Sequence, residues 1–201
     1  MDGMFRVLLD VSKLDAGAVH PRISVFPLAP LLARARLEFE PQARAKRLEL
    51  RVIRCSAFVK SDPALVERVL RNFISNAVRY TERGRVVVGC RRHKDALRLS
   101  VYDSGIGIDP AQQSLVFEEF YQVDNPERDR SKGLGLGLAI VQRLARLLDA
   151  RVTLQSRRGH GSLFAIDLQR AAPSRVAGTP AQPQWSRAAG SHRHAGRGGG
   201  R

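Results

Sequence analysis

Two asparagines lie one helical turn apart in a segment whose other residues predict an apolar helix. Asn72 and Asn76 are four residues apart, and Arg79 and Tyr80 follow Asn76 by three and four residues. Positions at this spacing share one face of a helix, opposite the apolar positions 65, 66, 69, 70, 73, 74 and 77. Two amides and a cation in line can hold a metal ion and phosphate oxygens. Taken alone, the segment is better explained as an exposed polar face.

A carboxylate followed by two alternating glycines is the second candidate for a binding site. Asp103 ends a strand-like run, and Gly105 and Gly107 come directly after it. Glycine allows the backbone to lie close against a flat ligand. A buried aspartate can accept a hydrogen from the exocyclic amino group of adenine, which guanine does not offer at that position. A glycine turn capped by the aspartate explains these residues equally well.

Three alternating glycines open a predicted apolar helix and form the third candidate. Gly133, Gly135 and Gly137 precede the run that begins with Leu138. Unblocked backbone N–H groups at the positive end of a helix dipole suit phosphate oxygens. The segment is not a P-loop, because no Gly-Lys-Ser/Thr follows, and Leu138 stands where the dinucleotide fingerprint needs its third glycine. By itself, a helix opened by glycines is weak evidence.

Helices and strands must position these three motifs. Helical spacing predicts helices at residues 28–44, 63–80 and 136–148, and Asp62 and Pro63 supply an N-cap and a first-turn proline for the second. Strands are predicted at residues 48–54, 57–60, 85–92, 96–103, 151–156 and 162–168. Residues 4–17 have the spacing of the last turns of an amphipathic helix that ends at Gly17. The chain therefore alternates helices and strands, as one α/β domain with flanking segments.

Length, charge and cysteine content limit the class of protein. The 201 residues suit one domain with a tail, and 43% hydrophobic content is enough for a core. Residues 171–201 are rich in Gly, Pro and Arg and are predicted to be a disordered basic tail. The chain has no apolar run of membrane-spanning length and no export signal, which predicts a cytoplasmic protein. Cys55 and Cys90 are interpreted as buried, reduced thiols.

The net charge of +15 raises the question whether the protein binds nucleic acid. The basic residues are dispersed over predicted solvent faces, and no zinc-finger spacing or RNA-binding signature accompanies them. A solvated surface is the simpler explanation, polyphosphate affinity is the next, and specific nucleic-acid binding is not expected. A nucleic-acid-binding protein would show steeply salt-dependent affinity for any duplex, chiefly through its tail.

The order of the motifs resembles one known family. The asparagine helix, the Asp-x-Gly-x-Gly turn, the Phe-Glu-Glu-Phe-Tyr run at residues 117–121 and the Gly-x-Gly-x-Gly segment follow one another as in the histidine-kinase ATP-binding domain. The resemblance covers residues 22–170, and residues 117–128 resemble bacterial hybrid sensor kinases in particular. Residues 1–21 resemble the end of the dimerisation and phosphoacceptor domain and a linker. The implied fold is an α/β two-layer sandwich, with a mixed, largely antiparallel sheet covered on one face by about three helices.

The resemblance also implies a role for each motif residue. Asn76 would bind Mg²⁺ between the phosphates of ATP, supported by Asn72, while Arg79 would contact phosphate and Tyr80 would line the nucleotide. Asp103 would accept from adenine. The remaining predicted nucleotide-binding residues are the glycines Gly105, Gly107, Gly133, Gly135 and Gly137, the lid anchors Phe117 and Phe120, and the lid residues Arg128, Arg130 and Lys132. One of these three basic lid residues would steady the γ-phosphate. The lid would span residues 109–132.

One position bears on the type of reaction. ATP-hydrolysing members of the wider superfamily carry a Glu one turn before the metal-binding Asn, and here that position holds Asn72, which is a poor base. Glu67 lies about 140° further round the helix and is a poor substitute. Phosphoryl transfer is therefore expected rather than hydrolysis. Serine-kinase anti-sigma factors share the nucleotide site and are a second enzyme interpretation.

The chain departs from the family in its histidines. A phosphoacceptor histidine is followed by Glu or Asp, whereas the five histidines here precede Pro21, Lys94, Gly161, Arg193 and Ala195. The expected activity is therefore transfer to a histidine supplied in trans by a phosphoacceptor domain, and indirectly to a response regulator. The alternative is a non-catalytic ATP-binding or interaction module that competes with an intact kinase.

Overall fold

The computed structural model describes residues 19–123 and 135–173 as a layer of helices packed on one sheet. The sheet contains β1 (Ser24–Pro27), β2 (Glu49–Val52), β3 (Phe58–Ser61), β4 (Arg85–His93), β5 (Ala96–Asp103), β6 (Arg151–Arg157) and β7 (Gly161–Ala171). The α-helices among these residues are α2 (Ala29–Ala45), α3 (Pro63–Tyr80) and α4 (Gly137–Leu147). Two short 3₁₀ helices, η1 (Pro110–Gln112) and η2 (Leu115–Phe117), follow β5.

The sheet is mixed but mostly antiparallel. Its strands follow the order β1-β3-β7-β5-β4-β2, and β6 pairs with β7 off this path. Only the β2–β4 pair is parallel among the described strands. In the long β5–β7 ladder Asp103 lies opposite Ser162, so that the end of β5 and the start of β7 meet at one edge of the domain.

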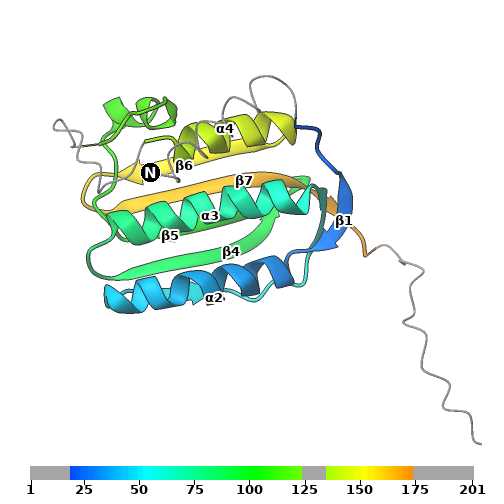
Figure 1. The fold of residues 1–201 in the computed structure, drawn as a ribbon, viewed down its shortest axis with the longest axis horizontal. Coiled ribbons are helices and arrows are strands. Elements are labelled where there is room, and N and C mark those ends of the chain that lie inside the picture. Colours follow the sequence, from blue (N-terminus) through cyan, green and yellow to red (C-terminus); the bar gives the residue numbers. More distant parts are fainter. Residues whose placement is uncertain (1–18, 124–134, 174–201) are drawn as a thin grey trace, which may run out of the picture.

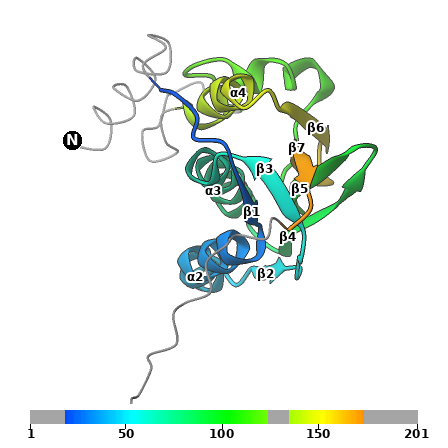
Figure 2. The ribbon, with the colours of Figure 1, turned by 90° about the vertical axis from the view of Figure 1, so that its right-hand side faces the viewer.

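All three α-helices cover the same face of the sheet, as Figures 1 and 2 show. Alternate residues of β5 and β7 point to this face and are buried, among them Leu99, Val101 and Ile166. The apolar stripe of α3 packs on them, and Phe73 and Phe164 stack with ring centroids 5.5 Å apart. Burying the apolar stripe of α3 leaves its polar residues at the rim of the core. The predicted fold class is confirmed.

Local signals explain the helix boundaries. Asp62 accepts hydrogen bonds from the backbone N–H groups of Ala64 and Leu65, at 2.8 and 3.1 Å, and thereby caps α3 as predicted. The predicted helices agree with α2, α3 and α4 to within one residue at each end. None of the described helices is long and apolar enough to cross a membrane.

The strands differ from the prediction in three places. No strand was predicted at β1, which pairs antiparallel with β3 at the edge of the sheet. Strand β2 ends at Val52, two residues before the predicted end, and β7 continues to Ala171, where the tail was predicted to begin. The rest of the predicted tail, from residue 174, and the predicted helix at residues 4–17 lie outside the described residues.

The interpretation of the cysteines as reduced thiols is wrong. Cys55 and Cys90 form a disulfide, with Cα atoms 6.4 Å apart, and both residues are half-buried. The parallel pairing of β2 with β4 places Val52 opposite Val88, and the chain just beyond these residues brings the two cysteines together. A link across 35 residues depends on this strand pairing, which no local pattern in the sequence indicates.

Candidate functional site

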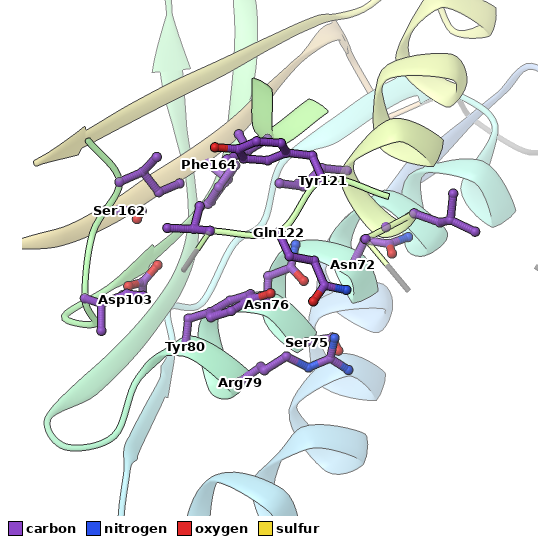
Figure 3. Close-up of a pocket in the computed structure, with 18 of the residues that line it drawn as sticks. Asn72, Ser75, Asn76, Arg79, Tyr80, Asp103, Tyr121, Gln122, Ser162 and Phe164 are labelled. Carbon is purple, nitrogen blue, oxygen red and sulfur yellow. The ribbon is translucent and has the colours of Figure 1, made fainter. Parts of the chain in front are cut away.

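A pocket opens between α3, the N-terminal end of α4 and the edge where β5 and β7 meet (Figure 3). Of the predicted site residues it is lined by Asn72, Asn76, Arg79, Tyr80, Asp103, Gly107, Gly135 and Gly137. Figure 3 shows Asp103 and Ser162 at one end and Asn72 at the other, with Asn76 and Tyr80 between them. The tertiary structure therefore brings together the three motifs that the sequence separates.

The polar face of α3 forms one wall of the pocket. Asn72 and Asn76 are partly exposed there, whereas the neighbouring Phe73, Ile74 and Ala77 are buried in the core. The Asn72 side-chain N–H donates to the backbone carbonyl of Arg68, at 2.8 Å. This hydrogen bond fixes the orientation of the amide and aims its oxygen at the start of α4.

Asp103 forms the opposite end of the pocket and is only 4% exposed. Its carboxylate accepts hydrogen bonds from the backbone N–H of Gly105, at 2.9 Å, and from that of Ser162. Burial raises the pKa of Asp103 to about 6, although the two hydrogen bonds act in the opposite direction. At neutral pH the site therefore offers a buried carboxylate, which is an acceptor for a ligand N–H group.

Ser162 is a site residue that sequence reasoning missed. It follows Gly161, whose φ of +87° and close approach to the Asp103 carbonyl exclude a side chain, since a Cβ there would lie 1.9 Å from that oxygen. Residue 162 was predicted only as the first residue of the strand at 162–168. The pairing of this strand with the strand that ends at Asp103 was not predicted, and it appears only in the folded structure.

The glycines after Asp103 accommodate the protein's own backbone. A Cβ at Gly105 would lie 2.4 Å from the Tyr80 carbonyl oxygen, and one at Gly107 would lie 2.0 Å from that of Arg157. Gly107 also has a φ of +67°. These glycines were predicted to let a flat ligand lie close against the backbone. In the structure, the segment from Asp103 to Gly107 is wedged between α3 and the β6–β7 turn, and Gly107 also lines the pocket.

Helix α4 presents its N-terminal end to the pocket. Gly137 is its first residue, and a Cβ there would lie 2.9 Å from Asn72 Oδ1, so that glycine allows α4 to approach α3. Gly135, with a φ of +68°, accepts a hydrogen bond from the Phe120 N–H at 3.1 Å. The first N–H groups of a helix have no partner within the helix itself, so this end of α4 suits an anion.

The predicted lid is described only in part. Phe117 is half-buried and packs against the core, whereas Phe120 is 54% exposed and does not line the pocket. Tyr121 and Gln122, which the prediction did not include, line it instead (Figure 3). Arg128, Arg130, Lys132 and Gly133 lie outside the described residues.

Glu67 lies away from the pocket. Its carboxylate pairs with Arg34 of α2 at 3.0 Å and is not among the pocket residues. The predicted geometry, with this side chain on another face of α3, is confirmed. Within the described ranges, the α3 wall of the pocket carries asparagines and no carboxylate.

The donor set fits a magnesium ion that arrives with phosphates. In residues 19–123 and 135–173, no group of three His, Cys, Asp or Glu side chains could hold a metal ion. Mg²⁺ is usually held by one or two protein oxygens, with phosphates and water completing its octahedron. The Asn76 side-chain oxygen, with Asn72 one turn away, is a donor of this type.

These features are those of an ATPase family. The chain belongs to the histidine kinase-, DNA gyrase B- and HSP90-like ATPases, whose family model matches residues 61–172. Its curated relatives are sensor histidine kinases, hybrid types among them. An uncharacterized sensor-like histidine kinase of Rhizobium meliloti is 33% identical over 164 residues, GacS of Pseudomonas protegens is 34% identical over 174, and TorS of Escherichia coli is 33% identical over 181.

The chain corresponds to a minor part of these relatives. The three alignments cover 80%, 83% and 86% of this chain, but 31%, 19% and 19% of the relatives. Among solved structures, full-length ShkA in complex with AMPPNP matches with a TM-score of 0.72 and 27% identity, covering 85% of this chain and 36% of that one. The Acinetobacter baumannii histidine kinase AdeS, with a TM-score of 0.67 and 20% identity over 85% of this chain and 79% of its own, supports the fold.

Proposed function

We propose that this chain binds Mg·ATP and transfers the γ-phosphoryl group to a histidine on a phosphoacceptor domain. The observation that carries the proposal is the composition of one pocket. A buried carboxylate lies at one end, Asn72 and a helix N-terminus lie at the other, and Asn76 lies between them. A nucleoside triphosphate has a matching arrangement, with a hydrogen-bonding base at one end and anionic oxygens at the other.

The base end of the pocket selects adenine. The Asp103 carboxylate accepts from the adenine amino group, and the N–H groups of Gly105 and Ser162 hold the carboxylate in place. Guanine presents a carbonyl oxygen at the equivalent position, and two oxygens facing one another repel. Because the site is buried, this repulsion is poorly screened.

The phosphate end of the pocket supports transfer. Asn76 holds the metal, Asn72 supports it from one turn earlier, Arg79 contacts phosphate, and the N-terminal N–H groups of α4 bind phosphate oxygens. When bound, Mg²⁺ neutralises charge on the phosphates. An asparagine at position 72 does not activate water, which favours transfer to an acceptor over hydrolysis. In this proposal Arg128, Arg130 or Lys132 steadies the γ-phosphate.

The acceptor histidine belongs to another chain or segment. None of the five histidines of this sequence is followed by an acidic residue. The sensor-kinase relatives support a phosphoacceptor domain as the partner, and a response regulator as the eventual receiver of the phosphoryl group.

Equilibrium binding tests the nucleotide site first. We expect ATP with Mg²⁺ to bind more tightly than GTP, and Asp103→Ala to lose this binding. Asp95→Ala is the matched control, because Asp95 is exposed in the turn at the far end of the same hairpin. Equal binding of ATP and GTP, or full binding by Asp103→Ala, would contradict the proposal.

Phosphoryl transfer separates the kinase from a non-catalytic module. Radiolabel from [γ-³²P]ATP is expected on a supplied phosphoacceptor domain with the wild-type chain and not with Asn76→Ala. A decoy that competes with an intact kinase would bind the phosphoacceptor domain without labelling it, and Asn76→Ala would bind that domain equally well. Labelling of a serine instead of a histidine would favour the anti-sigma type of kinase.

A further inference from the structure

Lys46 reaches from the end of α2 to the end of α3. Its ammonium donates hydrogen bonds to the backbone carbonyls of Val78 and Arg79, at 2.9 and 2.8 Å. These are two of the last four carbonyls of α3, which have no partner within the helix. The other two carbonyls also have hydrogen-bond partners, since that of Ala77 accepts from the Thr81 N–H and that of Tyr80 accepts from the Ile106 N–H.

The backbone of Lys46 is held firmly, so that its side chain is directed across the helix layer. The Lys46 N–H bonds back to the carbonyls of Gln42 and Ala43. Arg47 then adopts a φ of +56°, and Leu48 returns to the core. The Lys46 side chain therefore extends from a backbone position that is fixed at the C-terminal end of α2.

The last two turns of α3 also carry the pocket residues Asn76, Arg79 and Tyr80. A helix C-terminus carries partial negative charge on its open carbonyls. At the end of α3 this charge lies beside a pocket proposed to hold a polyanion. A cation that binds those carbonyls fixes the direction of the last turn and offsets its charge.

We infer that Lys46, which lies outside the pocket lining, is a positioning residue for the nucleotide site. It ties the C-terminal turn of α3 to α2 and thereby holds Arg79 and Tyr80 in their pocket orientation. The inference rests on the proposed function only where it concerns nucleotide affinity.

The test compares Lys46→Met, which removes the charge and both hydrogen bonds, with Lys46→Arg, which keeps a cationic donor. The matched control is Arg44→Met, because Arg44 lies in the last turn of the same helix with a side chain that is 82% exposed. Binding of Mg·ATP is measured at a temperature where every variant is folded by circular dichroism. Backbone amide shifts of residues 76–81 are recorded without nucleotide.

We expect Lys46→Met to weaken ATP binding about five- to tenfold and to shift the amide signals of residues 78–81. Lys46→Arg should recover most of the affinity, and Arg44→Met should bind as the wild type does. A folded Lys46→Met with wild-type affinity and unchanged amide shifts would overturn the inference, even if its melting temperature were lower. If the wild-type chain bound no ATP, the proposed function would fail, whereas the amide shifts would still decide whether Lys46 orders the turn.

Discussion

At the scale of single residues, Asp103 is the group whose chemistry depends most on its surroundings. Burial raises its pKa to about 6 from an ordinary value of 3.8. The carboxylate form, which we propose accepts the adenine amino hydrogen, is therefore lost as the pH falls through about 6. The same shift makes the ionised form costly to bury, so Asp103 opposes folding above this pH, and the opposition fades as the pH falls toward 4.

This pKa predicts a pH-dependent affinity for adenosine, which has no phosphates of its own to titrate. Affinity should fall about tenfold for each pH unit below 6, because only the deprotonated fraction binds. Carbon-detected NMR should show the Asp103 carboxyl titrating near pH 6, and adenosine should lower the midpoint. Asp103→Asn serves as the control and should bind weakly at every pH. A carboxyl midpoint near 4 would contradict the prediction.

Gly161 shows how a backbone position can support the site. With a φ of +87° and no room beside the Asp103 carbonyl, Gly161→Ala must displace the start of β7 and with it Ser162. We expect a loss of more than about 3 kcal/mol in the free energy of unfolding by urea. Gly159→Ala is the matched control, since its φ is +77° but nothing lies within 4 Å of the added carbon. It should cost about 1 kcal/mol, and equal losses in the two variants would show that backbone conformation alone sets the cost.

At the scale of elements, the strand β2 lies at the sheet edge and is short. Among the described strands it pairs only with β4, and the Cys55–Cys90 disulfide provides a covalent second attachment just beyond its end. The disulfide closes a loop of 35 residues that contains α3, the helix that carries Asn72 and Asn76. Constraining this loop in the unfolded chain stabilises the folded state.

Reduction of this disulfide should therefore lower the stability of the domain. We expect a decrease of about 3–4 kcal/mol in the free energy of unfolding when urea denaturation is repeated with a strong reductant. A variant with both cysteines changed to serine should already have the lower value and should not respond to reductant. Thiol alkylation of the denatured, unreduced wild type checks the starting state. Full alkylation would show that the cysteines are not joined.

At the scale of the whole molecule, the family match at residues 61–172 is smaller than the folded unit. Helix α2 lies outside this range and buries Leu31, Leu32 and Phe39 against the rest of the core. Lys46 directly follows this helix. Strands β1 and β3 lie at one edge of the sheet, and β2 lies at the other. We therefore expect the domain to need the elements that precede the matched region.

We predict that a chain beginning at residue 61 does not fold cooperatively, because removing α2 exposes the apolar side of α3 and removing β2 exposes the edge of β4. A chain of residues 19–173 should give a sigmoidal urea transition and a near-ultraviolet circular dichroism signal. The shorter chain should give neither. A cooperative transition in the shorter chain would show that α2 and β1 are accessory.

The sequence by itself determined the helices, most strands and the motif set. Apolar spacing and the Asp62 cap predicted α3 to within one residue, and the order of the glycine and asparagine motifs predicted the family. These signals are readable because helix periodicity, capping and turn formation depend on residues only a few positions apart.

Only the tertiary structure decided which distant residues meet. Ser162 reaches Asp103, Cys55 reaches Cys90, and Lys46 reaches the end of α3, each across more than 30 residues of chain. Such contacts follow from strand order, register and helix packing. These arise from how the whole apolar surface is buried at once, and no local pattern of residues specifies them.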